Sequence, residues 1–190
     1  MSLLSKYLSK IRANKVLPYV HGSVLDLGCG DALPLRFIPE RIDVYYGVEY
    51  DEKRVEKLTQ TFPNHKFFAK DLDEDILHFE KKFDTVLIMA VIEHLLNQKH
   101  FLKQVLKNSK PGGKIVITTP TPFGDWVHRI GSKLAIFAES ADHRHIIILS
   151  KTKLKLLANY FGLKIEKYQR FEFGCNQLIV LSKSNPDHPQ

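Results

Sequence analysis

The chain has 190 residues, of which 44% are hydrophobic and 26% charged, and a formal net charge of +7 at neutral pH. This length suits one domain with a substantial core and is too short for two, and no apolar run reaches the roughly 18–20 residues that span a bilayer. Because a signal-peptide pattern is also missing at the first residues, one soluble, cytoplasmic domain without transmembrane association is expected.

Strand and helix patterns alternate along the first two thirds of the chain. Residues 2–20 have the apolar spacing of a helix, which is expected to pack over the ligand site or along the sheet. Strands are predicted at 24–27, 44–49, 66–70, 85–89 and, after a turn at 111–113, at 114–119; helices are predicted at 33–38, 51–62 and 91–106. This alternation predicts a parallel, doubly wound sheet.

The last third of the chain departs from that alternation. Residues 120–142 concentrate large apolar side chains at helical spacing and are expected to form a lid-like insertion. Ser150 is expected to cap a helix over 151–160 that ends at Gly162. Strands at 163–171 and 177–182 are joined so tightly that they must form an antiparallel hairpin.

The predicted fold class is therefore α/β, with a doubly wound, seven-stranded, mostly parallel sheet and a C-terminal antiparallel hairpin. Residues 1–183 are expected to form a single domain with an N-terminal helix over 1–20, and residues 184–190 a disordered tail.

The segment VLDLGCG at 24–30 reads as a buried strand that ends in a carboxylate and turns through a Gly-X-Gly loop. Glycines let backbone N–H groups approach a ligand closely. A dinucleotide-binding loop would have Gly or Ala where Leu33 stands, and the charge of Asp26 disfavours a nearby pyrophosphate. The loop therefore favours a cationic nucleoside without phosphates, such as S-adenosylmethionine, and disfavours a dehydrogenase cofactor.

The order of these segments resembles that of the class I S-adenosylmethionine-dependent methyltransferases. Motif I of that family is similar to DLGCG at 26–30, and Glu49 stands roughly twenty residues further on, where a ribose-binding acid is expected. Further matching segments are FFAKD at 67–71, FDTVLIM at 83–89, Glu93-His94 and KPGG at 110–113. The resemblance extends from about Val24 to Leu181 and implies a Rossmann-like methyltransferase fold with S-adenosylmethionine as cofactor.

Ligands of open parallel sheets bind at the carboxyl ends of the strands, so the cofactor contacts are expected there. Glu49 can accept hydrogen bonds from a ribose diol, and the resemblance places Asp71 at the exocyclic amine of adenine. The full expected set is Asp26, Gly28, Cys29, Gly30, Glu49, Tyr50, Asp71, Leu72, Met89 and Ala90. Asp84 is instead expected to satisfy backbone groups or neighbouring charges outside the site.

His94, His143 and His145 are the candidate catalytic residues, because a neutral imidazole can take the proton that a hydroxyl nucleophile loses. Some relatives bind a divalent metal through a Glu-X-X-Glu-His pattern. Here Ala90 replaces the first glutamate, so no metal is expected. Two alternatives stay open: a modified metal site that includes Glu93, and a structural role for His94 at the start of its helix.

The expected activity is methyl transfer from S-adenosylmethionine to a small apolar or aromatic acceptor, with a hydroxyl as the favoured group. A nucleic-acid methyltransferase is the weaker alternative, suggested by 11 Lys+Arg against 6 Asp+Glu from Pro111 onward. The Asn/Asp-Pro-Pro-Tyr/Phe element typical of amino-group methylation is missing after the fourth strand. A non-catalytic, cofactor-binding regulator is the third alternative, and the oligomeric state is left open.

Overall fold

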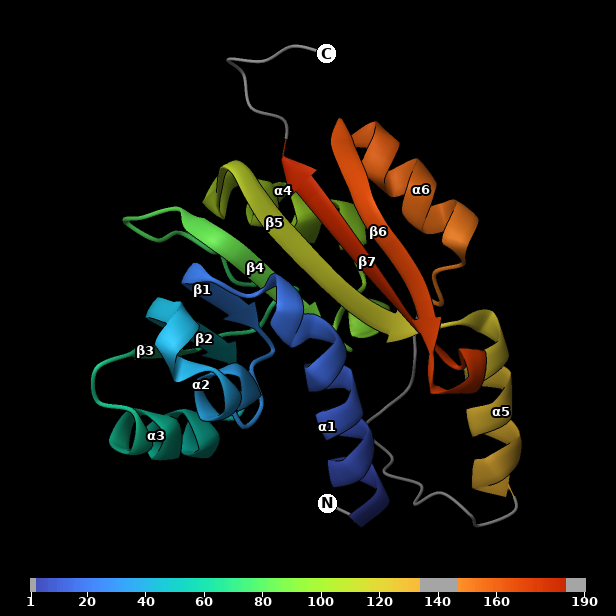
Figure 1. Cartoon of the computed structure of the whole chain (residues 1–190), viewed down its shortest axis with the longest axis horizontal. Coiled ribbons are helices and arrows are strands. Elements are labelled where there is room, and N and C mark those ends of the chain that lie inside the picture. Colours follow the sequence, from blue (N-terminus) through green and yellow to red (C-terminus); the bar gives the residue numbers. More distant parts are fainter. Residues whose placement is uncertain (1–2, 134–146, 184–190) are drawn as a thin grey trace.

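The computed structural model describes residues 3–133 and 147–183, built around one seven-stranded sheet (Figure 1). The strands are β1 (Gly22–Leu27), β2 (Ile42–Glu49), β3 (Lys66–Ala69), β4 (Phe83–Met89), β5 (Ser109–Pro120), β6 (Leu163–Phe171) and β7 (Asn176–Lys183). The α-helices are α1 (Leu3–Val16), α2 (Leu33–Phe37), α3 (Glu52–Thr61), α4 (Gln98–Asn108), α5 (Pro122–Lys133) and α6 (Lys151–Tyr160). Short 3-10 turns are η1 (Leu17–Tyr19), η2 (Pro39–Arg41), η3 (Ile92–His94) and η4 (Glu172–Gly174).

The strands lie in the order β3-β2-β1-β4-β5-β7-β6. All pairs from β3 to β5 are parallel, whereas β7 runs antiparallel to both β5 and β6. This topology confirms the predicted fold class, including the C-terminal hairpin. Because the chain moves outward from β1 to β2 on one side and returns to β4 on the other, the carboxyl ends of β1 and β4 form the switch point at which such sheets bind ligands.

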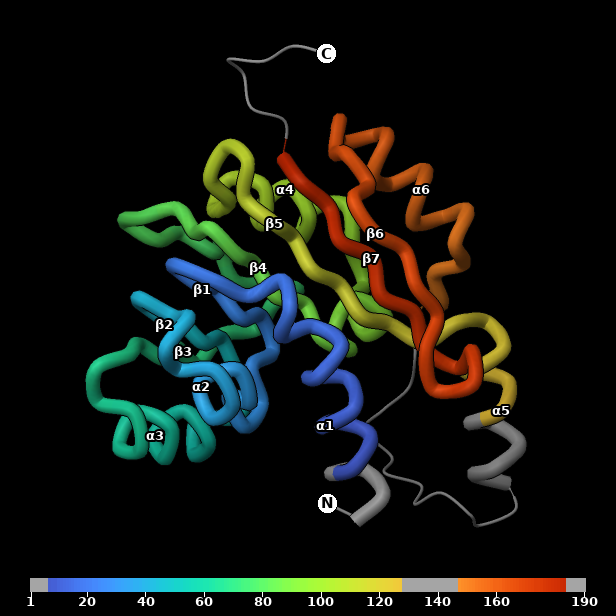
Figure 2. The backbone as a smooth tube through the Cα atoms, viewed as in Figure 1, coloured from blue at the N-terminus to red at the C-terminus, as the bar shows by residue number. Residues whose placement is uncertain are grey.

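Helices cover both faces of the sheet. On one face α1, α2 and α3 contribute Val16, Leu35 and Leu58 to the core, and on the other α4 and α6 contribute Phe101 and Leu154. In Figure 2, α1 passes in front of the sheet while α4 lies behind it, and both α1 and α5 extend past the carboxyl end of β5. The central strands are therefore buried on both faces, which explains their continuous apolar runs.

The helix predicted over 91–106 is wrong at its start, because α4 begins only at Gln98 and η3 precedes it. Ala90 has a left-handed backbone (φ 54°), which turns the chain sharply at the end of β4. The Asn97 side chain then accepts a hydrogen bond from the His100 N–H at 3.0 Å and caps α4 there.

The turn predicted at 111–113 lies within the bounds of β5 and interrupts its pairing. The partner of Phe83 is Ser109 and the partner of Thr85 is Lys114, so the residues between them have no partner in β4. Strand five is thus longer than predicted, with a bulge where the turn was expected.

The C-terminal predictions are confirmed for the described residues. Ser150 accepts a hydrogen bond from the Lys153 N–H at 3.3 Å, and Gly162 takes the left-handed conformation (φ 63°) that ends α6. The helix α5 occupies the first half of the expected insertion, while its remaining part, 134–142, and the expected tail at 184–190 lie outside the described residues. Within the described ranges, the structure has no helix with the length and apolar character needed to cross a bilayer.

Candidate cofactor-binding site

The glycine loop leaves β1 and is anchored to β2. The N–H groups of Gly28 and Cys29 both donate to the carbonyl of Val48, at 2.8 and 2.9 Å. Gly28 (φ 76°) and Gly30 (φ 54°) have left-handed backbones that favour glycine. A Cβ built at Gly30 would meet no heavy atom within 4 Å, so the loop is open at that residue.

Glu49 ends β2 and folds back onto this loop. Its Oε2 accepts a hydrogen bond from the Gly30 N–H at 2.9 Å, and its Oε1 accepts one from the Tyr50 N–H at 3.0 Å. The Arg54 guanidinium lies 3.5 Å from Oε2. A carboxylate has about four lone-pair positions, so Glu49 keeps capacity for further donors while its orientation is fixed.

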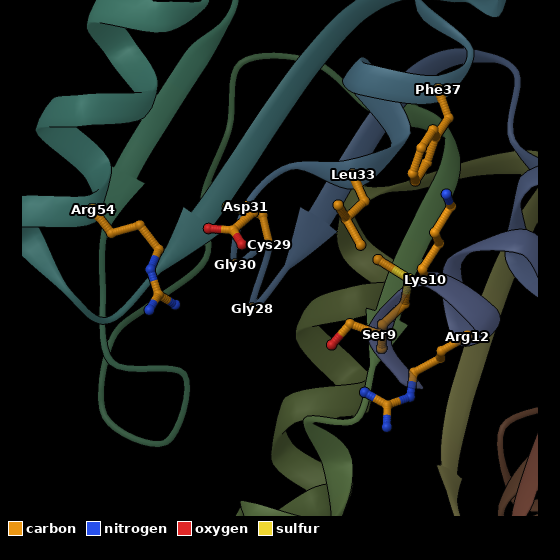
Figure 3. Close-up of a pocket in the computed structure, with 11 residues that line it drawn as sticks. Ser9, Lys10, Arg12, Gly28, Cys29, Gly30, Asp31, Leu33, Phe37 and Arg54 are labelled. Carbon is orange, nitrogen blue, oxygen red and sulfur yellow. The ribbon is translucent and has the colours of Figure 1, made fainter. Parts of the chain in front are cut away.

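A cavity of about 340 Å³ separates the glycine loop from α1 (Figure 3). Its lining residues are Ser9, Lys10, Arg12, Gly28, Cys29, Gly30, Asp31, Leu33, Phe37, Arg54 and Met89. The structure thus brings together four of the predicted contacts, Gly28, Cys29, Gly30 and Met89, with cations from α1 and α3. Lys10 and Arg54 are already engaged, with the Phe37 ring and with Glu49 respectively.

Arg12 is a cavity residue that the sequence analysis missed. Its Nε is buried and has no hydrogen-bond partner among the described residues. Ser9 and Arg12 are three residues apart on α1 and so share one helix face (Figure 3). The expectation that this helix packs over the site was a signal for Ser9 and Arg12, because both are polar and lie on the face of α1 that lines the cavity.

Tyr50 and Asp71 line a second, more open hollow of about 750 Å³. The two hollows adjoin at the carboxyl end of β2, because Arg54 lines the first and pairs with Glu49, while Tyr50 follows Glu49 in the chain. Asp71 is partly engaged, since its Oδ1 accepts a hydrogen bond from the Asp73 N–H at 2.8 Å. Leu72 is half-buried and packs against the core beside this hollow.

Asp26 is fully buried on the sheet face that α1 covers. Its Oδ2 accepts a hydrogen bond from the Tyr45 hydroxyl at 2.5 Å, while its Oδ1 has no partner among the described residues. Burial raises the pKa of Asp26 to about 7; the Tyr45 hydrogen bond opposes this rise and the charge of Glu49 adds to it. Burial and the same two carboxylates also raise the pKa of Cys29, so its thiol stays protonated and is a packing group.

The end of β4 supplies the remaining predicted residues. Met89 lines the cavity, and the Ala90 N–H donates to the Thr118 carbonyl at 2.9 Å. Glu93 is buried and His94 half-buried in η3, whereas His143 and His145 lie outside the described residues. Within the described ranges, no three His, Cys, Asp or Glu residues are grouped closely enough to hold a metal ion.

The fold and this site together define a class of protein. The sequence model of the methyltransferase domain family matches residues 3–168, most of the chain. The chain therefore belongs to the class I S-adenosylmethionine-dependent methyltransferases.

Two curated relatives and one solved structure illustrate the range of this family. The mitochondrial ubiquinone biosynthesis O-methyltransferase of Dictyostelium discoideum is 29% identical over 61% of this chain and 41% of its own length. A tRNA U34 carboxymethyltransferase of Pseudoalteromonas translucida is 26% identical over 64% of this chain and 40% of its own. Magnesium protoporphyrin IX methyltransferase of Synechocystis, solved with bound S-adenosylhomocysteine, has a TM-score of 0.64 at 16% identity and covers 95% of this chain and 81% of its own. The chain spans about two fifths of the length of the curated relatives it matches.

Proposed function

We propose that this chain transfers the methyl group of S-adenosylmethionine to a small apolar or aromatic molecule, at a hydroxyl group. The main support for this cofactor is the hydrogen bond from the Gly30 N–H to Glu49. This bond holds the acid at the end of β2 against the open glycine loop. The two adjoining hollows there suit a ligand with a nucleoside at one end and an amino acid at the other.

The residues divide between the two ends of that ligand. Glu49 accepts the ribose hydroxyls, and Tyr50 and Asp71 lie on the side of the base. Arg12 suits the carboxylate of the amino-acid end, because its buried Nε lacks a partner among the described residues and a guanidinium pairs well with a carboxylate. Gly30 provides the open backbone between the two ends.

When bound, the cofactor supplies a methyl group that its positive sulfur already makes electrophilic. The chain must then align the acceptor, exclude water and take up a proton from a hydroxyl nucleophile. His94 in η3 follows directly from the end of β4 and is a proposed base, together with His143 and His145.

The acceptor class is supported by apolar side chains of the cavity and of α5. Leu33, Phe37 and Met89 form the apolar part of the cavity lining. Phe123 and Trp126 on α5 are exposed and stack at 6.2 Å between ring centroids, with 27° between their planes. The similarity to a ubiquinone biosynthesis O-methyltransferase favours such an acceptor.

Nucleic-acid methylation is the second candidate function. It is favoured by the net charge of +7 and by the similarity to a tRNA U34 carboxymethyltransferase. Binding of this kind depends strongly on salt, because cations displace counterions from the phosphates. A gel shift with tRNA that weakens steeply as salt rises would support this candidate.

The first test is calorimetric titration of the purified protein with S-adenosylmethionine, S-adenosylhomocysteine and NAD. Binding of the first two without the third is expected, and it justifies a screen of hydroxylated aromatic compounds with a labelled methyl donor. Binding of NAD alone would overturn the proposal. Tight cofactor binding without methyl transfer to any acceptor would favour a regulator.

A further inference from the structure

Tyr45 and Asp26 form a buried polar pair just before the glycine loop. Both side chains have 0% exposure. In the register of β1 and β2, Val24 pairs with Tyr45 and Asp26 with Gly47, so the two side chains are diagonal neighbours on one sheet face. The Tyr45 hydroxyl donates to Asp26 Oδ2 at 2.5 Å. Gly47, directly opposite Asp26, has no room for a side chain, because a Cβ there would lie within 3 Å of Phe67 and of the Cys29 sulfur.

The second oxygen of this carboxyl group lacks any such partner. Oδ1 is buried and receives no hydrogen bond from the described residues, and no described cation forms an ion pair with Asp26. A buried ionised oxygen without a partner is unfavourable, so the free protein has a position that a cationic donor can fill.

The groups around the pair explain why this position suits a cation. Glu49 on β2 adds negative charge, and the Cys29 thiol and the Tyr45 hydroxyl are both neutral. Leu87 on β4 and Val16 on α1 belong to the same face and are apolar. The Tyr45 hydroxyl is already used on Oδ2, a thiol is only a weak donor, and no hydrogen bond from the described residues reaches Oδ1.

We propose that Tyr45 is a positioning residue for cofactor recognition: its hydroxyl holds Asp26 Oδ2 and leaves Oδ1 as the acceptor for the ammonium group of the cofactor. This role rests on the proposed function, since S-adenosylmethionine and S-adenosylhomocysteine both carry that group. With one oxygen fixed by Tyr45, the carboxylate cannot rotate freely, and the direction of Oδ1 is set before the ligand arrives.

The pair also couples cofactor binding to a proton. Because burial raises the pKa of Asp26 to about 7, part of the free protein carries the neutral acid at physiological pH. An ammonium group binds the ionised form, so binding releases a proton below that pKa. The affinity is then expected to rise with pH, by up to about tenfold per pH unit, and to level off above the pKa. Without the Tyr45 hydroxyl the hydrogen bond that lowers this pKa is lost, and the rise moves to higher pH.

The test compares Tyr45→Phe with Tyr46→Phe. The second variant also removes a tyrosine hydroxyl, from the next residue of β2. Tyr46 packs in the core of the opposite sheet face, against Phe68 and Phe79. Each protein is titrated from about pH 5.5 to 8.5 with S-adenosylhomocysteine and with 5′-deoxy-5′-methylthioadenosine, which has no amino-acid end. For the homocysteine ligand, wild type and Tyr46→Phe are expected to share one curve, while Tyr45→Phe shifts to higher pH and binds several-fold more weakly at pH 7. The methylthio ligand is expected to show no such shift.

Asp26→Asn provides the second variant. Its affinity for S-adenosylhomocysteine is expected to be low and independent of pH, and calorimetry in two buffers of different ionisation enthalpy should detect proton release for wild type only. If Tyr45→Phe does not fold, the comparison of wild type with Asp26→Asn tests the proposal instead. Equal proton release in these two proteins would overturn the proposed recognition of the ammonium group by the Tyr45–Asp26 pair. Identical curves for Tyr45→Phe and Tyr46→Phe, or an equal pH dependence of the methylthio ligand, also overturn it. A wild-type protein that binds neither ligand refutes the proposed function itself.

Discussion

Gly28 and Gly30 are two residues apart in one loop, but the space around them differs. A Cβ at Gly28 would lie 2.3 Å from Cγ2 of Val91, so the protein itself fills that space. A Cβ at Gly30 would meet nothing within 4 Å, although the backbone is left-handed at both residues. Gly28 is therefore required by the fold, whereas the small size of Gly30 is what the proposed cofactor site would use.

Alanine substitutions should separate these two requirements. Gly30→Ala is expected to lose only about 1 kcal/mol of unfolding free energy through its positive φ, and to weaken S-adenosylhomocysteine binding at least about tenfold. Gly28→Ala should lose about 2–3 kcal/mol, because crowding against a β-branched side chain adds to the strain, and Val91→Ala in the same chain should restore part of it. Urea denaturation and calorimetry measure both effects. Wild-type affinity in Gly30→Ala would place the ligand elsewhere.

Glu49→Gln tests the acid that ends β2. The glutamine keeps one acceptor oxygen for the Gly30 N–H, but it loses the charge that pairs with Arg54 and the second acceptor for a ribose diol. Affinity for S-adenosylhomocysteine is expected to fall by about 1–3 kcal/mol, or roughly ten- to a hundredfold, with little change in stability. Glu56→Gln, an exposed change of the same kind on α3 that lines neither hollow, is the control. Equal affinities in the two variants would contradict the ribose role.

The site residues differ in how far the sequence could predict them. The spacing of Glu49 from the glycine loop is a local pattern and placed it correctly at the end of β2. For Arg12 the only signal was the expectation that its helix packs over the site, because an arginine on a helix is usually solvated; Tyr45 carries no signal, because a tyrosine in a strand is usually core. Their roles depend on what lies opposite them in space, which for Tyr45 is the Asp26 carboxyl group.

At the scale of elements, the contact between α5 and η4 determines where the expected lid begins. The Thr121 N–H donates to the Cys175 carbonyl at 2.8 Å, and the Thr121 hydroxyl donates to the Gly174 carbonyl at 2.7 Å. The same hydroxyl accepts a hydrogen bond from the Gly124 N–H at 3.0 Å. A Cβ at Gly124 would lie 1.9 Å from the Cys175 carbonyl oxygen, so glycine is what permits this close approach.

Gly124→Ala should therefore displace the first turn of α5. The clash is with backbone atoms, which cannot rotate away, so a loss of about 2 kcal/mol or more is expected. Trp126 on α5 is the only tryptophan of the chain, and its fluorescence and near-ultraviolet circular dichroism report on this helix directly. Gly112→Ala, at an exposed glycine with open space around it, should leave the Trp126 signal unchanged. An unaltered signal in Gly124→Ala would mean that α5 does not depend on this contact.

Elements with a local signal were predicted well, and those set by tertiary contacts were not. The span of α6 follows from its Ser150 cap and from Gly162, and both lie in the sequence itself. The helix predicted from residue 91 fails because Val91 packs over Gly28 and Ala90 is left-handed, so the chain cannot enter a helix there. The apolar spacing of that segment is real, but packing at the end of β4 overrides it.

For the molecule as a whole, two carboxyl groups of the sheet, the partly exposed Asp84 and the buried Asp26, act on stability in opposite directions. Asp84 accepts hydrogen bonds from the Ser23 hydroxyl at 2.6 Å and from the Lys110 ammonium at 2.7 Å, which agrees with the structural role predicted for it. Although burial raises the pKa of Asp84, these hydrogen bonds lower it to about 2, so its contribution is present above pH 4 and is lost as the pH falls further. The pKa of Asp26 is instead raised to about 7, so its contribution to stability is lost as the pH rises.

The direction in which Asp26 changes the free energy of unfolding with pH follows from its pKa values in the folded and unfolded states. The ordinary pKa is 3.8 and the folded value about 7, so the folded protein binds this proton more tightly than the unfolded chain. Its contribution to stability is complete below pH 3.8 and is lost as the pH rises to 7. The free protein should then be less stable at pH 8 than Asp26→Asn, by up to about 4 kcal/mol, whereas the two should converge near pH 4.

Urea denaturation of wild type and Asp26→Asn at about pH 5, 6.5 and 8 measures this difference. Burial lowers the pKa of His65, which reduces stability as the pH falls below 6.5, but His65 titrates in both proteins and cancels in the comparison. A difference that does not grow with pH would show that Oδ1 is already satisfied in the free protein. A variant that is more stable at pH 8 but binds cofactor poorly would identify the unpaired carboxyl oxygen as a destabilising feature kept for ligand recognition.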